Sequence, residues 1–112
     1  ITVNNVAPTV KAGADQTITA GEPLAAAAAF TDPGPLDTHT ATIAWGDSAV
    51  TTGTVDQLAQ TISGTHIYAS DGEFVVTITV TDDDGGFGTA TFSVTVIAPD
   101  PLDRIYLPLI TR

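Results

Sequence analysis

The sequence contains no cysteine and no methionine, and only 3 of its 112 residues are lysine or arginine. Without cysteine, disulfide bonds, thiolate metal sites and a thiol nucleophile are all excluded from this chain. Its stability must therefore come from a packed core, which a chain of this length can form as a single domain. No apolar stretch approaches the roughly 20 residues that a membrane-spanning helix needs.

Charge is scarce and has almost one sign. Only 14% of the residues are charged, and 13 of them are acidic, which gives a formal net charge of −10. Phosphate backbones and anionic lipid surfaces are bound through clusters of lysine and arginine. We therefore expect no nucleic-acid partner. The same acidic surface favours solubility and attracts divalent cations.

The abundant residues are valine, isoleucine, threonine and alanine, and they alternate with a period of two. Apolar and polar residues alternate from Phe74 to Thr81 and again from Thr89 to Val96. The aspartates and glycines of Asp82–Gly86 lie between these runs and favour the unusual backbone angles of a tight turn. The sequence therefore predicts a β-hairpin over these residues.

The segment Leu24–Thr31 contains five consecutive alanines. Alanine favours helices, but eight residues are too few for an independent helix. Turn residues on both sides predict instead a strand whose small side chains let the facing sheet approach closely. Further strands are predicted at Val10–Ala12, Gln16–Ala20, Thr40–Trp45, Val50–Val55 and Thr61–Tyr68.

About seven short strands separated by turn signals predict an all-β fold, an immunoglobulin-like two-sheet antiparallel β-sandwich. Four short motifs occur along these strands in a fixed order and spacing. They are Trp45-Gly46-Asp47-Ser48, His66-Ile67-Tyr68, Gly72-Glu73-Phe74 and Asp82-Asp83-Asp84-Gly85.

In that order the motifs resemble the signature of a PKD domain, over about Asn5 to Val96. Two residues of the first motif are deleted, Ser48 replaces the usual glycine and Phe74 the usual tyrosine. PKD domains are immunoglobulin-like modules of bacterial and archaeal surface proteins and secreted hydrolases. The resemblance therefore implies a PKD-type sandwich without catalytic activity, located outside the cell or on its surface.

Several residues of these motifs are expected to have structural roles. We expect Trp45 in the core, His66 buried and hydrogen-bonded, and Asp47 accepting backbone N–H bonds in a turn that Gly46 permits. Gly46-Asp47-Ser48 also matches a hydrolase nucleophile block, but that chemistry needs a strand-to-helix turn, and no helix follows. The other histidine, His39, is expected to be solvent-exposed or weakly paired.

The chain divides into three parts by composition. Residues 1–4 look like a joint to a preceding module or a strand contributed to it, 5–98 form the sandwich, and 99–112 are an apolar C-terminal tail. The opening residues carry no basic and apolar leader, so we expect the interior of a longer precursor or a processed end.

The resemblance also implies a calcium site, because some PKD domains bind calcium near the joint with the preceding module. Calcium takes about six to eight oxygen ligands, which carboxylates and carbonyls supply. The alternative is that the aspartates shape turns and keep the sandwich soluble. The matching candidate ligands are Asn5, Asp32, Asp82, Asp83 and Asp84.

Both ends of the chain carry strand-forming apolar residues that need a partner. They support three roles: a structural or adhesion module contacting adjacent modules, a self-assembling filament or surface-layer subunit, or an accessory module binding a polysaccharide or collagen-like polymer for a secreted hydrolase. The candidate interaction residues are Ile1, Val3, Ile105, Tyr106, Leu107, Leu109 and Ile110.

Overall fold

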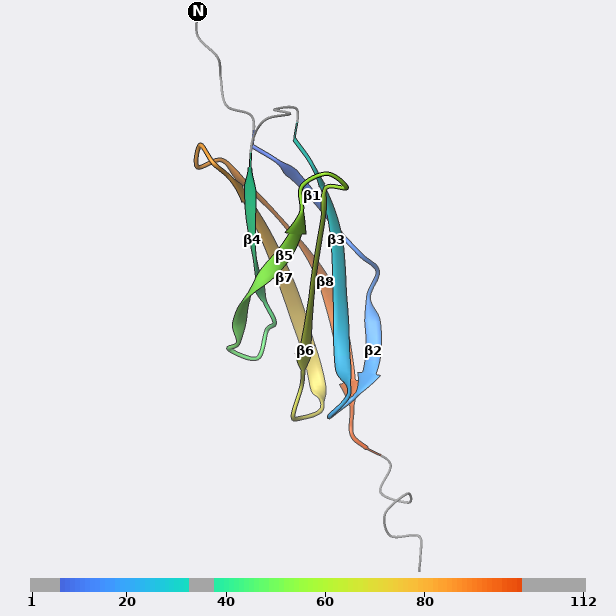
Figure 1. The fold of residues 1–112 in the computed structure, drawn as a ribbon. Helices are drawn as coiled ribbons and strands as arrows, with labels where there is room; N and C mark the ends of the chain where they lie inside the picture. Colours follow the sequence, from blue (N-terminus) through green and yellow to red (C-terminus); the bar gives the residue numbers. More distant parts are fainter. Residues whose placement is uncertain (1–6, 33–37, 100–112) are drawn as a thin grey trace, which may run out of the picture.

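The computed structural model describes residues 7–32 and 38–99, and all regular secondary structure within these ranges is β-strand (Figure 1). Accordingly, this part of the chain has no helix with the length and hydropathy to cross a membrane. The strands are β1 (Thr9–Ala12), β2 (Gln16–Thr19), β3 (Pro23–Thr31), β4 (His39–Ala44), β5 (Val50–Asp56), β6 (Thr61–Ile67), β7 (Gly72–Asp82) and β8 (Phe87–Ile97).

Strand β5 joins two layers into one curled sheet. The hydrogen-bonded order is β1-β3-β6-β5-β4-β7-β8-β2. β5 pairs with β4 over Val50–Gly53 and with β6 over Thr54–Asp56, so it passes from one layer to the other. The layer β1-β3-β6 therefore faces the layer β4-β7-β8-β2. This confirms the predicted all-β, immunoglobulin-like sandwich, with eight described strands where about seven were predicted.

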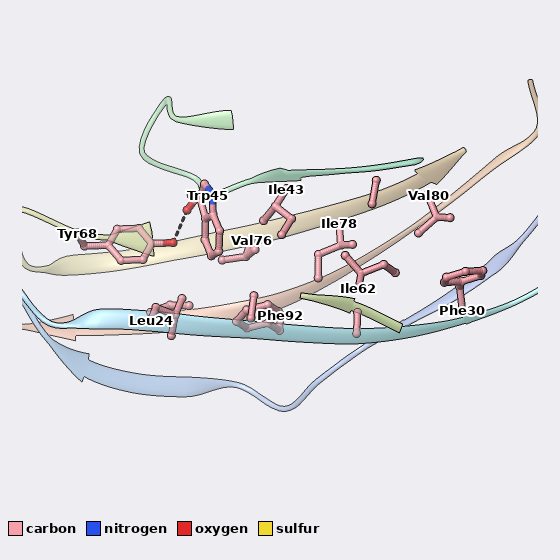
Figure 2. Close-up of a cluster of buried hydrophobic side chains, with 14 of the residues drawn as sticks. Leu24, Phe30, Ile43, Trp45, Ile62, Tyr68, Val76, Ile78, Val80 and Phe92 are labelled. Carbon is pink, nitrogen blue, oxygen red and sulfur yellow. Dashed lines mark hydrogen bonds between the residues drawn. The ribbon is translucent and has the colours of Figure 1, made fainter. Parts of the chain in front are cut away.

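The core lies between the two layers. In β3 the even-numbered residues are buried and the odd-numbered ones exposed, which is the period that a strand with one covered face requires. Figure 2 shows Trp45, Ile43 and Val76 on one side of the core and Leu24 of β3 on the other. Burying each large side chain contributes about 1.5–3 kcal/mol, so this apolar face determines the fold.

The alanine-rich segment forms β3, as predicted, because its small residues fit a crowded part of the core. Ala26 lies opposite Gly64 of β6. A Cβ on Gly64 would lie 2.6 Å from Cδ1 of Ile43 and 3.6 Å from Cζ2 of Trp45. The two small residues therefore make room for large side chains of the other layer, and this packing overrides the helix propensity of alanine.

The first two strands belong to different layers. β1 pairs antiparallel with β3, whereas β2 pairs parallel with β8, from Gln16 opposite Val94 to Thr19 opposite Ile97. β1 begins at one end of the sandwich and β8 finishes at the opposite end (Figure 1). We call these the entry end, which carries the β7–β8 turn, and the exit end, which carries the β4–β5 and β6–β7 turns.

Candidate functional site

At the exit end, Trp45 and Tyr68 close the core. The Tyr68 hydroxyl donates a hydrogen bond of 2.6 Å to the backbone carbonyl of Trp45 (Figure 2). Trp45 Nε1 donates to Thr51 Oγ1 at 2.9 Å, and both aromatic residues are fully buried. Burial, together with the negative charge of Asp47, raises the pKa of Tyr68 to about 12. These polar groups therefore hold the end of the core together.

Asp47 and His66 form a half-buried pair on the rim of this cluster. Asp47 Oδ2 lies 2.7 Å from His66 Nε2, and its Oδ1 accepts a hydrogen bond of 3.2 Å from the Ala49 N–H. Burial acts to raise the pKa of Asp47, but the hydrogen bonds from His66 and Ala49 outweigh it and lower that pKa below 3.8. The His66 ring stacks on Trp45. The carboxylate thus holds the turn, as the sequence predicted.

The entry end contains a second aspartate–histidine pair, and this one is buried. His39 Nε2 lies 2.8 Å from Asp32 Oδ2, and the two side chains are 3% and 1% exposed. His39 Nδ1 lies 2.8 Å from Gln57 Oε1, while Gln57 Nε2 donates to the His39 carbonyl at 3.0 Å. Both ring nitrogens of His39 therefore have a side-chain oxygen within hydrogen-bonding distance.

The expectation that His39 is exposed or weakly paired is wrong. His39 begins β4 and shares the inward phase of Ala41 and Ile43, and its ring packs against Phe30 with 4.6 Å between ring centroids. That phase is visible in the sequence and indicates burial. The partner Gln57 follows β5, and no sequence spacing pointed to it.

Asp82 ends β7 and holds the β7–β8 turn. Its Oδ1 accepts hydrogen bonds from the N–H groups of Asp84 (2.9 Å) and Gly86 (2.8 Å). The residue is 4% exposed, and among the described residues its second oxygen, Oδ2, has no hydrogen-bond partner. Burying a carboxylate oxygen without a partner costs folding free energy, so a hydrogen-bond donor or a cation at this atom would stabilise the domain.

Two exposed carboxylates lie beside this buried one. Asp82, Asp83 and Asp84 each offer one oxygen, and the three oxygens lie within 4.8 Å of one another. Calcium prefers such oxygen ligands, and backbone carbonyls of a turn commonly complete its set. The geometry therefore fits part of a calcium site, with the buried Oδ2 as the feature that distinguishes it from an ordinary acidic turn.

The other residues predicted for the calcium site or for interactions are not in the group of Asp82, Asp83 and Asp84. Asp32 is bonded to His39, and the carboxylate group that the structure brings together contains Asp82, Asp83 and Asp84 instead. Asn5 and all candidate interaction residues lie outside the described ranges. These interaction residues are Ile1, Val3, Ile105, Tyr106, Leu107, Leu109 and Ile110.

Comparison with known proteins agrees with this architecture. A family model described as PKD domain matches residues 5–96. The PKD domain of an M14-like peptidase from a Thermoplasmatales archaeon is 20% identical with a TM-score of 0.63, and the match covers 87% of this chain and 100% of that one. A search of curated proteins found no match.

Two structures from Vibrio are similar as well. The PKD1 domain of Vibrio anguillarum Epp is 20% identical with a TM-score of 0.58, covering 86% of this chain and 100% of that one. The PKD1 domain of the Vibrio cholerae metalloprotease PrtV is 22% identical with a TM-score of 0.55, covering 82% and 99%. At these identities the likeness concerns the fold.

Proposed function

The chain belongs to the PKD domain family, and on that premise we propose that it is a non-catalytic extracellular module of a surface or secreted protein. Its role is structural: it links the parts on either side of it and carries tension between them. The similar structures support a linking role, because they are described as PKD domains of a peptidase and of a metalloprotease, and so as parts of larger proteins.

The observation that carries the proposal is the arrangement of the terminal strands. β1 begins at the entry end and β8 finishes at the exit end (Figure 1), so a pull on the chain stretches the sandwich along its strands. β2 and β8 run parallel, and such a pull moves them in opposite directions along their shared axis. Their hydrogen bonds are then loaded in shear and must break together rather than one after another.

Two further hydrogen bonds lie at the borders of this parallel ladder. Asp15 Oδ1 accepts from the Ser93 N–H at 2.9 Å, and the Ala20 N–H donates to the Ile97 carbonyl at 2.9 Å. Because the first is a charge-assisted bond, it is stronger than a neutral one. We call it the Asp15 lock, and it extends the sheared contact beyond the four paired residues of β2.

Single-molecule stretching of the full chain tests this role. We expect Asp15→Ala to lower the force at which the domain unfolds when it is pulled through its ends. The matched control is Asp71→Ala, which removes an exposed aspartate of the β6–β7 turn and is expected to leave the force unchanged. Equal forces for the wild type and Asp15→Ala would count against the lock as a load-bearing contact.

The other two roles have less support in the described residues. A polymer-binding module needs exposed aromatic rings, but Trp45 and Tyr68 are buried, and Phe87 is the one aromatic residue of 7–32 and 38–99 among the exposed large hydrophobics. Filament assembly would depend on the apolar ends of the chain, which lie outside these ranges. A connecting module is therefore the role that the geometry supports best.

We propose in addition that the Asp82–Asp84 group binds calcium. The buried Oδ2 of Asp82 supports this, because a cation would satisfy an oxygen that lacks a partner among the described residues. The group lies in the β7–β8 turn at the entry end (Figure 1). A cation there would stiffen the end that faces the preceding part of the protein.

Calorimetric titration of the full chain with calcium, against magnesium and a chelator, tests the site. We expect Asp83→Asn with Asp84→Asn to abolish binding while the fold persists, since both side chains are exposed. Asp56→Asn, which changes the exposed aspartate that ends β5 at the same end of the sandwich, is the control and should bind like the wild type. No heat of binding in the wild type would refute the calcium proposal and leave the structural role standing.

A further inference from the structure

An aliphatic strip, defined here as Val50, Val75 and Ile97, lies toward the exit end on the outer face of the layer that β4, β7, β8 and the start of β5 form. These residues are 63%, 56% and 48% exposed. Small residues separate the first two: Ala44 lies opposite Val50, and the backbone of Val75 packs against Gly46. No bulky polar side chain therefore separates Val50 from Val75, whereas Ser93 and Thr95 lie between Val75 and Ile97.

One carboxylate lies within the strip. Glu73 lies two residues before Val75 and opposite Thr95, so it projects from the same face between Val75 and Ile97. A partner that fits this surface combines apolar side chains with a positive charge. The chain has such a segment: the apolar residues 105–110 are flanked by Arg104 and Arg112, two of its three cationic residues.

We propose that residues 105–110 of the same chain dock on the aliphatic strip, with Arg104 beside Glu73. The position at which the described chain ends supports an intramolecular contact. Eight residues separate Pro99 from Leu107 and reach at most about 27 Å. From Pro99 back to Ser93, which lies opposite Val75, six residues of strand cover about 20 Å. The segment can therefore turn and reach the strip.

The same limit on how far Leu107 can lie from Pro99 excludes docking of this segment at the entry end. Leu58 is 95% exposed and lies in the β5–β6 turn, farther toward the entry end than Gly53. Successive register partners place Gly53 beside Ala41, Ala41 beside Val80, and Val80 beside Gly88, so Gly53 and Gly88 lie at the same height in the sheet. The eleven residues from Gly88 to Pro99 correspond to about 36 Å of strand. Leu58 is thus exposed and apolar but too distant for residue 107. Ile67 is 56% exposed and ends β6, in the other layer at the exit end, so it is the matched control.

Because the chain lacks cysteine, paired cysteines give an unambiguous test. In the full chain, Val75→Cys with Leu107→Cys should oxidise to an intramolecular disulfide at a rate independent of protein concentration. Ile67→Cys with Leu107→Cys should react several-fold more slowly. Disulfide-linked dimers whose yield rises with concentration would assign the strip to a second copy and overturn the proposal. Equal rates for the two pairs, or no disulfide in the first, would overturn it as well.

Charge reversal gives a second readout. Arg104→Glu in the Val75→Cys, Leu107→Cys background should slow disulfide formation several-fold, and adding Glu73→Arg should restore the rate. Unchanged near-ultraviolet circular dichroism would verify that the sandwich remains folded in each variant. If Arg104→Glu leaves the rate unaltered, the pairing with Glu73 is wrong. The outcome bears on residues 105–110 and not on the load-bearing role of β2 and β8.

Discussion

The two ends of the sandwich each contain an aspartate–histidine pair, but the pairs differ in burial. At the exit end the side chains of His66 and Asp47 are 17% and 24% exposed. At the entry end those of His39 and Asp32 are 3% and 1% exposed. Water can solvate the first pair and screen its charges, whereas the second relies on protein partners alone.

The ends also differ in how completely their polar atoms are bonded. At the exit end the Tyr68 hydroxyl and the Asp47 carboxylate both have partners. At the entry end Asp82 Oδ2 is buried without one among the described residues. Three of the four signature motifs thus lie at the exit end. The fourth, Asp82–Gly85, lies at the entry end and contains the buried oxygen that has no partner among the described residues.

The largest expected effect comes from the two histidines. His39→Ala removes the hydrogen-bonded partner of a buried carboxylate, and we expect the free energy of unfolding to fall by about 3–5 kcal/mol. His66→Ala breaks a pair that water can reach, and we expect a loss of about 1 kcal/mol from the pair, plus its stacking on Trp45. Urea denaturation at neutral pH measures both. A loss for His66→Ala equal to or larger than that for His39→Ala would contradict the contrast between the ends.

Two glycines give an intermediate effect and isolate one steric contact. Gly46 and Gly85 have φ of 88° and 93°, so alanine at either position costs about 1–2 kcal/mol in backbone strain. A Cβ at Gly46 would also lie 2.7 Å from the Val75 carbonyl oxygen, whereas one at Gly85 meets nothing within 4 Å. We therefore expect thermal unfolding to show Gly46→Ala as less stable than Gly85→Ala, by about 1–3 kcal/mol for the added clash. Equal stabilities would contradict the added clash and mean that the backbone at Val75 moves away from the new Cβ without a cost in stability.

The smallest effects are the pH dependences of the exit end. The folded pKa of Tyr68, about 12, exceeds its ordinary value of 10.0, so its contribution to stability is present below pH 10 and is lost between pH 10 and 12. The lowered pKa of Asp47 has the opposite sense, and its contribution is lost as the pH falls below 3.8. Tyr68→Phe should flatten the alkaline limb of the stability profile and Asp47→Asn the acid limb, each by no more than about 1–2 kcal/mol. A limb that is unchanged in its variant would show that other groups control it.

Much of the fold could be predicted from the sequence because the strands have one covered face. The alternation over Phe74–Val96 predicted the hairpin of β7 and β8, and turn residues around Leu24–Thr31 predicted a strand despite five alanines. Strand pairing was less accessible. The parallel pairing of β2 with β8 joins residues about 78 apart in sequence, and no local pattern specifies such a contact.

The candidate site was predicted only in part. Three successive aspartates before a glycine indicated an acidic turn, and the structure brings Asp82, Asp83 and Asp84 together. The sequence did not reveal that His39 bonds to both Asp32 and Gln57, because those contacts depend on how the entry ends of three strands pack. Burial of His39 was indicated by its phase in β4, but its place at a loop-to-strand boundary beside Asp37 and Thr38 favoured exposure.

The direction of pulling tests the central claim most directly. Handles attached through the two ends of the chain load β2 and β8 in shear, whereas handles on Thr19→Cys and Ile97→Cys, which are register partners, peel the two strands apart. Single-molecule stretching should show a several-fold higher unfolding force in the first geometry than in the second, at the same thermodynamic stability. Equal forces in both geometries would contradict a load-bearing arrangement of the terminal strands.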